Sequence, residues 1–417
     1  MMTKIEREKK IQYSGILVSL FITLKPIYIW SSGVLQLCDF VMLFGFFAVL
    51  IHSRGKIRLD KRKMNFLYLM LSLCLYQFLV NAVWTSVLNE NIMRSTLYYI
   101  YNLFAVCFFF LVDEEIGTGI LKHYIMIGCF CSLVITTVGI VILSGTGRST
   151  GFFNNPNQLG YYALLVFALT ILCGHETSLI IRISSIVMSI FAIVASSSKA
   201  AFFGMIITML LYIFINGKKT TWKKVIIQIL LICVAVILIY ILLFSDNSVI
   251  SSNYTVRLLR YRVLNMSKEN DTSLGEGRGY NRVFEMDFHL LWGMGEGAFH
   301  RFVTLKNLEV HSSFVSLLVS YGLIGLFGYL ILFYKALGRF RRQLANYALI
   351  SGLLFYQLSH NGIRNTLFWL LIAVMLVENC AKNNDLTNDN CGELLSDELV
   401  ENFEKSNDLT RADCDVL

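Results

Sequence analysis

Apolar runs about as long as a lipid bilayer is thick recur along almost the whole chain, and they constrain its fold more than any other feature. About 20 apolar residues suffice for a helix to cross the hydrocarbon core. Inside a bilayer every backbone amide needs a partner within the protein, so only helices and closed barrels can span it. A barrel would show alternating segments of about ten residues, which these continuous runs do not resemble. We therefore predict an all-α, polytopic integral membrane protein.

The composition agrees with this prediction. Hydrophobic residues make up 56% of the 417 residues and charged residues only 15%, too few charges to cover a soluble domain. The mean hydropathy is +0.61. The chain contains only two prolines, Pro26 and Pro156, which suits long uninterrupted helices.

The apolar runs predict about 12 transmembrane helices. The predicted spans lie near 14–31, 33–51, 65–85, 95–112, 123–143, 158–174, 179–196, 200–216, 223–245, 312–334, 344–359 and 366–380. The charged N-terminus has no small-residue cleavage site, so we expect the first span to be retained rather than removed as a signal peptide. Residues 1–380 are expected to form one membrane domain.

Three connections between these spans are strongly basic: 52–63, 216–224 and 334–342. Short loops rich in lysine and arginine stay in the cytoplasm, and 12 spans place all three loops and both termini there. The polar segment 246–311, between the ninth and tenth spans, then forms a large extracytoplasmic loop. Residues 381–417 hold ten acidic and three basic residues, which predicts an acidic, disordered cytoplasmic tail. The basic excess of the rest follows from topology, so no nucleic-acid partner is expected.

Several basic side chains nevertheless fall in segments predicted to lie outside, where the positive-inside rule should deplete them. They are Arg148, Lys199, Arg278, Arg282, Arg301 and Arg364, with His311 and His360. Arginine binds phosphate oxygens through two parallel hydrogen bonds, and lysine adds a point charge. The set therefore suits a phosphorylated ligand such as a lipid-linked sugar pyrophosphate. For any single residue, snorkelling toward lipid headgroups is a sufficient alternative.

The local contexts of these cations differ. Arg148 precedes a predicted turn in which Asn157 is a plausible helix N-cap. Lys199 lies between two spans with almost no loop, which would hold it at the outer mouth of the bundle. Arg278 and Arg282 are spaced i, i+4 and would share one face if this stretch is helical.

His311 opens the stretch "VHSSFVSLLVSYGLIG" at the predicted re-entry into the membrane. Imidazole accepts a proton near neutral pH, so it can act as a general base on a sugar hydroxyl. Ser312 and Ser313 could orient the imidazole or cap the helix. An ordinary residue at the start of an interfacial helix is the alternative. No metal-ligand spacing stands out, so we expect no metal and no cofactor.

The same stretch resembles the signature of the O-antigen ligase and polysaccharide polymerase superfamily. That signature is a histidine and a small polar residue, then nine residues to a glycine and two more to a small residue; His311, Ser312, Gly322 and Gly325 fit it. These glycines would also line one side of the helix for close packing. "RSTGFFNNPNQLG" resembles the outer turn of that family, and "GRGYNR" resembles its arginine region before the histidine.

The resemblance implies a membrane glycosyltransferase that takes glycans from a polyprenyl-pyrophosphate carrier, without a nucleotide sugar or a required metal. Arg148, Arg278 and Arg282 would bind the pyrophosphate. Lys199 would be a weaker contact. Such proteins often have arginine at this position, and lysine cannot form the two parallel hydrogen bonds of a guanidinium. His311 would deprotonate the attacking hydroxyl, and the anomeric centre would invert.

The expected function is therefore polymerisation of repeat units for a capsular or O-antigen polysaccharide at the extracytoplasmic face of the bacterial inner membrane. Its expected partners are lipid-linked donor and acceptor glycans, the bilayer, a chain-length regulator and a flippase. Two alternatives remain open: an O-antigen ligase that transfers glycan to lipid A core, and a lipid-linked glycan transporter. Lys25 and Asp39 flank the first outer turn, where we predict a mutual salt bridge rather than proton coupling in a carrier.

Overall fold

The computed structural model describes residues 4–31, 33–53, 57–88, 92–143, 147–217, 257–258, 260–261, 264–265, 279–297, 310–338 and 343–381. These residues form helices and their connections, with no β-strand among them, as predicted for an all-α protein. The ninth predicted span and the acidic tail after residue 381 lie outside the described residues, as does Arg278.

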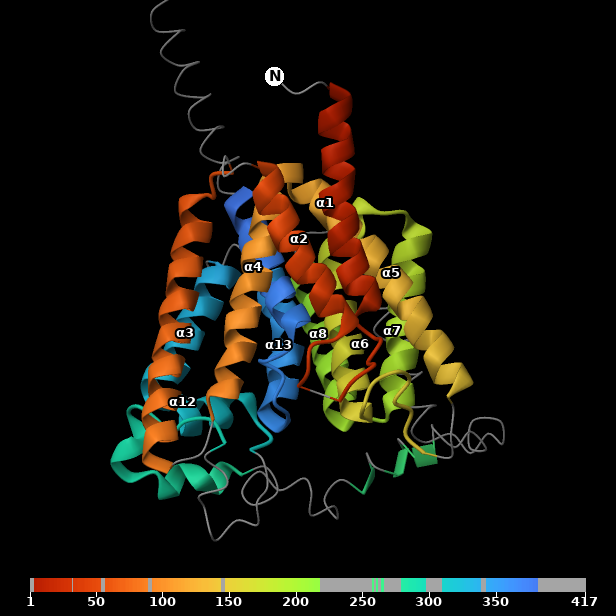
Figure 1. Ribbon diagram of the computed structural model, residues 1–417. Coiled ribbons are helices and arrows are strands. Elements are labelled where there is room, and N and C mark those ends of the chain that lie inside the picture. Colours follow the sequence, from red (N-terminus) through yellow and green to blue (C-terminus); the bar gives the residue numbers. More distant parts are fainter. Residues whose placement is uncertain are drawn as a thin grey trace, which may run out of the picture.

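The long helices lie side by side, and helices that follow one another in the sequence run in opposite directions (Figure 1). Their bounds are α1 Lys4–Leu24, α2 Leu37–Ser53, α3 Lys61–Leu88, α4 Thr96–Ile116, α5 Thr118–Ile142, α6 Pro156–Cys173, α7 Leu179–Ser196, α8 Lys199–Gly217, α12 Ser313–Leu337, α13 Leu344–Ser359 and a last described helix, Thr366–Ala381. Short 3-10 helices are η1 Met93–Ser95, η2 Gly174–Glu176, η5 Tyr280–Glu285 and η6 Asp287–Leu290.

Six of these helical segments are long and apolar enough to cross a membrane, and four more are shorter apolar helices of 10–17 residues. Their surface supports the same conclusion. Phe40, Phe44, Phe47 and Ile51 are each more than half exposed and recur at helical spacing, so they form one apolar face of α2. Soluble proteins rarely expose such continuous apolar faces. The chain is a multi-pass membrane protein.

The first helix ends earlier than predicted. The span was expected at 14–31, whereas α1 ends at Leu24 and the chain turns through Lys25. The residue before a proline is disfavoured in the α conformation, and Pro26 follows Lys25 directly. At the other end, α1 extends beyond its apolar part into the charged N-terminal stretch.

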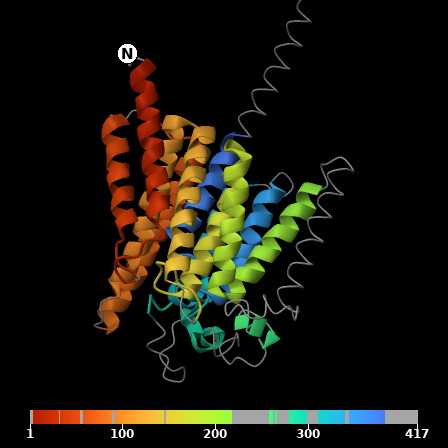
Figure 2. The same cartoon turned by 90° about the vertical axis from the view of Figure 1, so that its right-hand side faces the viewer.

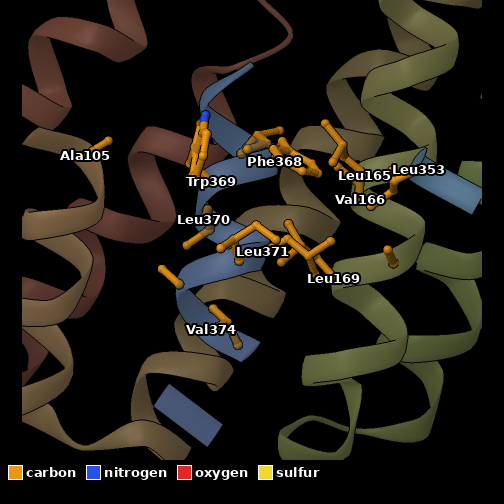
Figure 3. Packing of buried hydrophobic residues seen from close by; sticks show 14 of the residues in the cluster. Ala105, Leu165, Val166, Leu169, Leu353, Phe368, Trp369, Leu370, Leu371 and Val374 are labelled. Carbon is orange, nitrogen blue, oxygen red and sulfur yellow. The ribbon is translucent and has the colours of Figure 1, made fainter. Parts of the chain in front are cut away.

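The last described helix, Thr366–Ala381, lies within the bundle (Figures 1 and 2). Its side chains Leu367, Phe368, Trp369, Leu370, Leu371 and Ile372 are all fully buried. Figure 3 shows several of them packed against side chains of neighbouring helices. The Trp369 indole donates a 2.7 Å hydrogen bond to the Ile363 carbonyl. A helix that is apolar on every side is suited to such a fully enclosed position.

Glycines allow α8 and α13 to approach each other closely. A side-chain carbon added at Gly352 would lie 2.0 Å from the carbonyl oxygen of Gly204, and one added at Gly204 would lie 2.6 Å from the carbonyl oxygen of Gly352. Helices in a bilayer associate through such small residues because lipid offers little hydrophobic drive between them. This packing places the end of α13 beside the start of α8.

The described parts of the connections predicted to lie outside gather at one end of the bundle, which we call the loop end. There the Asn154 side chain donates to the Trp30 carbonyl, and the Ser149 amide donates to the Ala195 carbonyl. The residues 279–297 lie at the same end (Figure 1, teal). At the opposite end, Lys63 forms ion pairs with Asp113 and Glu114. Membrane crossings in alternating directions explain why every second connection returns to the same end.

Candidate functional site

Four of the five predicted site residues are described, and all four lie at the loop end. His311 directly precedes α12, Arg282 lies in η5, Arg148 precedes α6, and Lys199 begins α8. The fifth predicted residue, Arg278, lies outside the described residues, one position before the described Gly279. The contacts of the four fall into two groups.

The first group surrounds His311. Its side chain is half-buried and has no hydrogen-bond partner among the residues that the structure describes. Ser312 is the N-cap of α12, and its hydroxyl accepts a hydrogen bond from the Val315 amide, so the predicted capping role is confirmed. The helix N-terminus carries a partial positive charge. The imidazole therefore lies at the electropositive start of a helix, and the capping hydrogen bond fixes the adjacent residue, Ser312.

Ser313 fixes the connection between α13 and the last described helix against this site. Its hydroxyl oxygen accepts hydrogen bonds from the Gly362 amide at 2.9 Å and the Ile363 amide at 3.3 Å. The same hydroxyl donates to the His360 carbonyl at 3.3 Å. Ser313 is fully buried, and a buried hydroxyl with several partners is well ordered. The second predicted outer histidine, His360, is thereby held close to His311.

Arg282 lies beside the residue that precedes His311. A side-chain carbon added at Gly279 would be 3.4 Å from the Val310 side chain and 3.6 Å from Nε of Arg282. The side chains of Val310 and Arg282 therefore both lie next to Gly279. Gly279 has a positive φ of 76°, which suits glycine. Arg282 is only 1% exposed. Arg282 lies in η5, a 3-10 helix that begins at Tyr280. The shared helical face expected for Arg278 and Arg282 stays a prediction, because Arg278 lies outside the described residues.

Tyr280 ties η5 to both neighbouring helices. Its hydroxyl donates to the Leu358 carbonyl at 2.6 Å and lies 3.2 Å from the Ser312 hydroxyl. The first contact reaches α13 and the second reaches the cap of α12. These contacts connect η5, which carries Arg282, to the start of α12, which directly follows His311.

The second group joins Arg148 to the start of α8. The Arg148 guanidinium donates from Nε to the Ser196 carbonyl at 3.0 Å and from Nη2 to the Asn157 side chain. Ser197 has a left-handed conformation with φ 47°, so α7 ends and α8 begins within two residues. Lys199, 9% exposed, follows three residues after Ser196. Two cations that are 51 positions apart in sequence thus share this turn.

The N-cap of α6 differs from the prediction. Asn155 caps this helix, and its side chain accepts from the Gln158 amide at 2.9 Å, while Asn157 lies within the first turn. Pro156 occupies the first helical position, where its missing N–H costs nothing. Asn157 is consequently free of the capping role and binds Arg148 instead.

One turn of α13 lies between the two groups. The Tyr356 ring stacks on Tyr161 with centroids 4.4 Å apart and on His360 at 4.6 Å. Its hydroxyl donates to the Asn157 carbonyl at 3.0 Å. The next residue, Gln357, accepts a hydrogen bond from the Ser312 hydroxyl through its carbonyl. A continuous set of contacts therefore links Arg148 and Lys199 to His311 and Arg282.

A buried network next to this site was not predicted. The Glu296 carboxylate, in a residue only 3% exposed, accepts hydrogen bonds from the hydroxyls of Tyr99 at 2.7 Å and Tyr321 at 3.1 Å. It also forms an ion pair with Arg364. The Glu296 amide donates to the Asn81 side chain. In the sequence Glu296 stands in "GMGEG", and no local signal there points to this network.

Helix α12 is broken at Gly322, where continuous helix was predicted. Gly322 has φ 63° and ψ −167°, a conformation almost confined to glycine. The segment 291–295 fits against the break: the Met294 amide donates to the Val319 carbonyl, and the Gly295 amide donates to the Ser320 carbonyl, both at 2.9 Å. Non-helical backbone at this depth is tolerated where protein supplies its partners.

The arrangement combines a half-buried imidazole with several guanidinium and ammonium groups at one end of a helical bundle. Such a set can bind an anion and accept a proton. Among the residues that the structure describes, no three His, Cys, Asp or Glu side chains gather in a way that could hold a metal ion. No protein-family model and no curated protein matches this chain.

Proposed function

We propose that this chain is a membrane glycosyltransferase that polymerises polyprenyl-pyrophosphate-linked repeat units of a capsular or O-antigen polysaccharide. The supporting observation is the meeting of three distant segments around the last turn of α13. These segments carry Arg148, Arg282 and His311, and they are the same segments that resemble the motifs of the polymerase and ligase superfamily.

In the proposed reaction, His311 removes the proton from a hydroxyl of the acceptor sugar. The hydroxyl oxygen then forms a bond to the anomeric carbon of the donor glycan. The bond between that carbon and the pyrophosphate oxygen breaks, and the polyprenyl pyrophosphate leaves with the electron pair. Attack opposite to the leaving group inverts the anomeric centre. General-base assistance of this kind contributes typically 10²–10⁴-fold to a rate.

The cations have a different role in the proposed reaction, because negative charge develops on the departing pyrophosphate. Preorganised donors aimed at such charge supply much of the stabilisation in enzymes. Arg282 is buried beside Val310 and Arg148 is held by Ser196, so neither guanidinium has to be ordered during the reaction. Arg278 and Lys199 complete the proposed pyrophosphate site, with Lys199 contributing charge without a bidentate fork.

We place the loop end on the extracytoplasmic side of a bacterial inner membrane. Support comes from the opposite end, which carries the basic sequence from Lys61 to Lys63 at the start of α3; basic residues near span ends favour the cytoplasm. On this orientation the donor's polyprenyl chain lies in the bilayer and its glycan projects outside. A flippase would supply the lipid-linked units, and a chain-length regulator would be a further partner.

The test uses the purified full chain in lipid vesicles with a polyprenyl-pyrophosphate-linked repeat unit, and products are sized on a gel. A polymerase yields a ladder of chain lengths. His311→Ala should lose the ladder, and His52→Ala, an exposed histidine at the opposite end, should keep it. No ladder from the wild-type chain with intact substrate would overturn the proposal.

The same vesicles separate the alternatives. A ligase would transfer glycan once to added lipid A core and form no ladder on repeat units alone. A transporter would move labelled lipid-linked glycan between leaflets without forming a new glycosidic bond. The polymerase is favoured over the transporter because the described ion pairs that line the bundle, such as Lys63–Asp113 and Arg364–Glu296, lie near the ends of helices rather than along a path through the membrane.

A further inference from the structure

A cavity opens at the loop end, on the side of the bundle formed by α2 and α4. Its volume is about 510 Å³, and its walls come from the α1–α2 connection, from η1 and α4, and from the start of the last described helix. Binding sites for small molecules commonly enclose 300–1,000 Å³. The cavity is separate from the His311 group, although Arg364 in its wall follows Ile363, which binds Ser313.

The charges in the wall favour an anion. Lys25, Arg94 and Arg364 line the cavity together with one carboxylate, Asp39, a net charge of +2 (3 − 1). Counting Glu296 behind Arg364 still leaves +1 (3 − 2). Arg94 is exposed and forms no ion pair with any described residue, so its charge is available to a ligand.

The wall is held in place before any ligand binds. The Gln36 side chain, only 4% exposed, accepts hydrogen bonds from the amides of Ile29 and Trp30 and donates to the Val34 carbonyl. This one side chain thereby shapes the α1–α2 connection. Preorganised walls reduce the ordering that a ligand must impose on binding.

Two of the three cations in the wall, Lys25 and Arg364, are also anchored. Lys25 lies 3.4 Å from the Asp39 carboxylate, which confirms the predicted salt bridge, and the Tyr101 hydroxyl donates to the same carboxylate at 2.6 Å. The Arg364 guanidinium pairs with Glu296 and lies 5.7 Å from the centre of the Tyr98 ring. An arginine fixed by a carboxylate on one edge is well suited to hold an oxyanion on another.

The rest of the wall is apolar and exposed. Leu97 is 62% exposed, Val34 and Leu35 are each 44% exposed, and Phe104 is 39% exposed. A small inorganic anion would gain nothing from these side chains, whereas a hydrocarbon chain would cover them. In a multi-pass protein, exposed apolar side chains such as these can face the hydrocarbon of the bilayer.

We propose that this cavity binds the phosphate headgroup of a membrane lipid, with Arg94 and Arg364 holding the phosphate and the hydrocarbon chain lying along Leu97 and Phe104. The site is independent of glycan transfer and stands whether or not His311 is catalytic. Its chemistry accepts a polyprenyl phosphate or a phospholipid, since both join a phosphate to a long apolar chain.

The test is photocrosslinking of the purified full chain in detergent with a benzophenone-bearing farnesyl phosphate, followed by mapping of the labelled peptides by mass spectrometry. Label is expected on the peptides that contain Val34 and Leu97. Arg94→Gln should reduce that labelling by about tenfold, the usual scale for one charge-assisted hydrogen bond. Val34→Asp, a new negative charge on an exposed wall position, should reduce it similarly.

Lys61→Gln removes an exposed charge at the opposite end of α3 and is the matched control, with no expected change. Farnesyl phosphate or phosphatidylglycerol should compete with the probe, and whichever competes better identifies the lipid. Farnesol or inorganic phosphate competing equally well would overturn the proposal, as would unchanged labelling in Arg94→Gln. His311→Ala should keep the label at Val34 and Leu97, so failure of the transferase proposal would be recognised separately.

Discussion

The carboxylate of Glu296 is paired with the guanidinium of Arg364, although 68 positions separate them in the sequence. Glu296 belongs to the described segment between α8 and α12, and Arg364 precedes the last described helix. The pair therefore fastens the segment 279–297, which contains Arg282, to the core of the bundle. Tyr99 of α4 and Tyr321 of α12 complete the attachment.

Glu296→Gln should lower the stability of the protein. The amide can keep bonds to the tyrosine hydroxyls but leaves Arg364 without its counter-charge. Breaking a buried ion pair costs about 3–5 kcal/mol, and we expect roughly 2–4 kcal/mol because the Arg364 side chain is 27% exposed. Thermal unfolding in detergent measures the effect. Glu176→Gln, at an exposed glutamate, is the control and should change stability by less than about 0.5 kcal/mol.

Gly322→Ala should also destabilise the protein. The conformation of Gly322 costs other residues about 1–3 kcal/mol, and the added carbon would lie 2.3 Å from the Leu291 carbonyl oxygen. Gly119→Ala provides the contrast, because its nearest neighbour is 3.8 Å away and alanine is the better helix former. The two midpoints of thermal unfolding should move in opposite directions; equal midpoints would mean that the break in α12 does not require glycine.

His311→Ala should reduce polymer formation by at least 10²-fold while leaving the yield and the unfolding temperature of the purified protein unchanged. The reason is the loss of a general base from a half-buried side chain that has no hydrogen bond to the described residues. Initial rates of ladder formation measure it. Retention of wild-type rates and chain lengths would remove His311 from the proposed mechanism.

Lys199→Ala and Lys199→Arg should separate charge from side-chain geometry. Removing the ammonium should raise the KM for the lipid-linked donor by about tenfold, whereas arginine keeps the charge and should stay close to wild type. Steady-state rates at varied donor concentration provide the values. Lys335→Ala, in an exposed lysine near the opposite end of α12, serves as control. An equal loss in both Lys199 variants would argue for a packing role instead.

The orientation of the bundle can be read by cysteine labelling in whole cells. Gly147→Cys lies at an exposed position of the loop end and Lys61→Cys at an exposed position of the opposite end. A membrane-impermeant maleimide should label position 147 in intact cells and position 61 only after permeabilisation. The unsubstituted chain gives the background from the native cysteines. The reverse pattern would put the His311 group in the cytoplasm and exclude an extracytoplasmic transferase.

The helices and their approximate limits could be predicted because they depend on local properties. An apolar run of bilayer length has few alternatives to a helix, so α3 to α7 lie close to the predicted spans. The capping role of Ser312 followed from the residue type alone. The Lys25–Asp39 pair could be predicted because both residues flank one short turn.

The features that were missed depend on partners far away in the chain. Asn155 rather than Asn157 caps α6 because Pro156 fits the first helical position, a one-residue choice that composition does not decide. The break at Gly322 exists because the segment 291–295 supplies donors for carbonyls of α12. The sequence around Gly322 gives no indication that the segment 291–295 packs against it.

The sequence by itself determined that this chain is a helical multi-pass membrane protein, since apolar length and backbone hydrogen bonding leave no other way to satisfy the bilayer. Only the tertiary structure decided which side chains meet. Glu296 pairs with Arg364, and Arg148 donates a hydrogen bond to the α7–α8 turn. Both contacts form because a buried charge is tolerated only where packing brings complementary groups to it. That complementarity is a property of helices arranged in space, and residue order alone does not contain it.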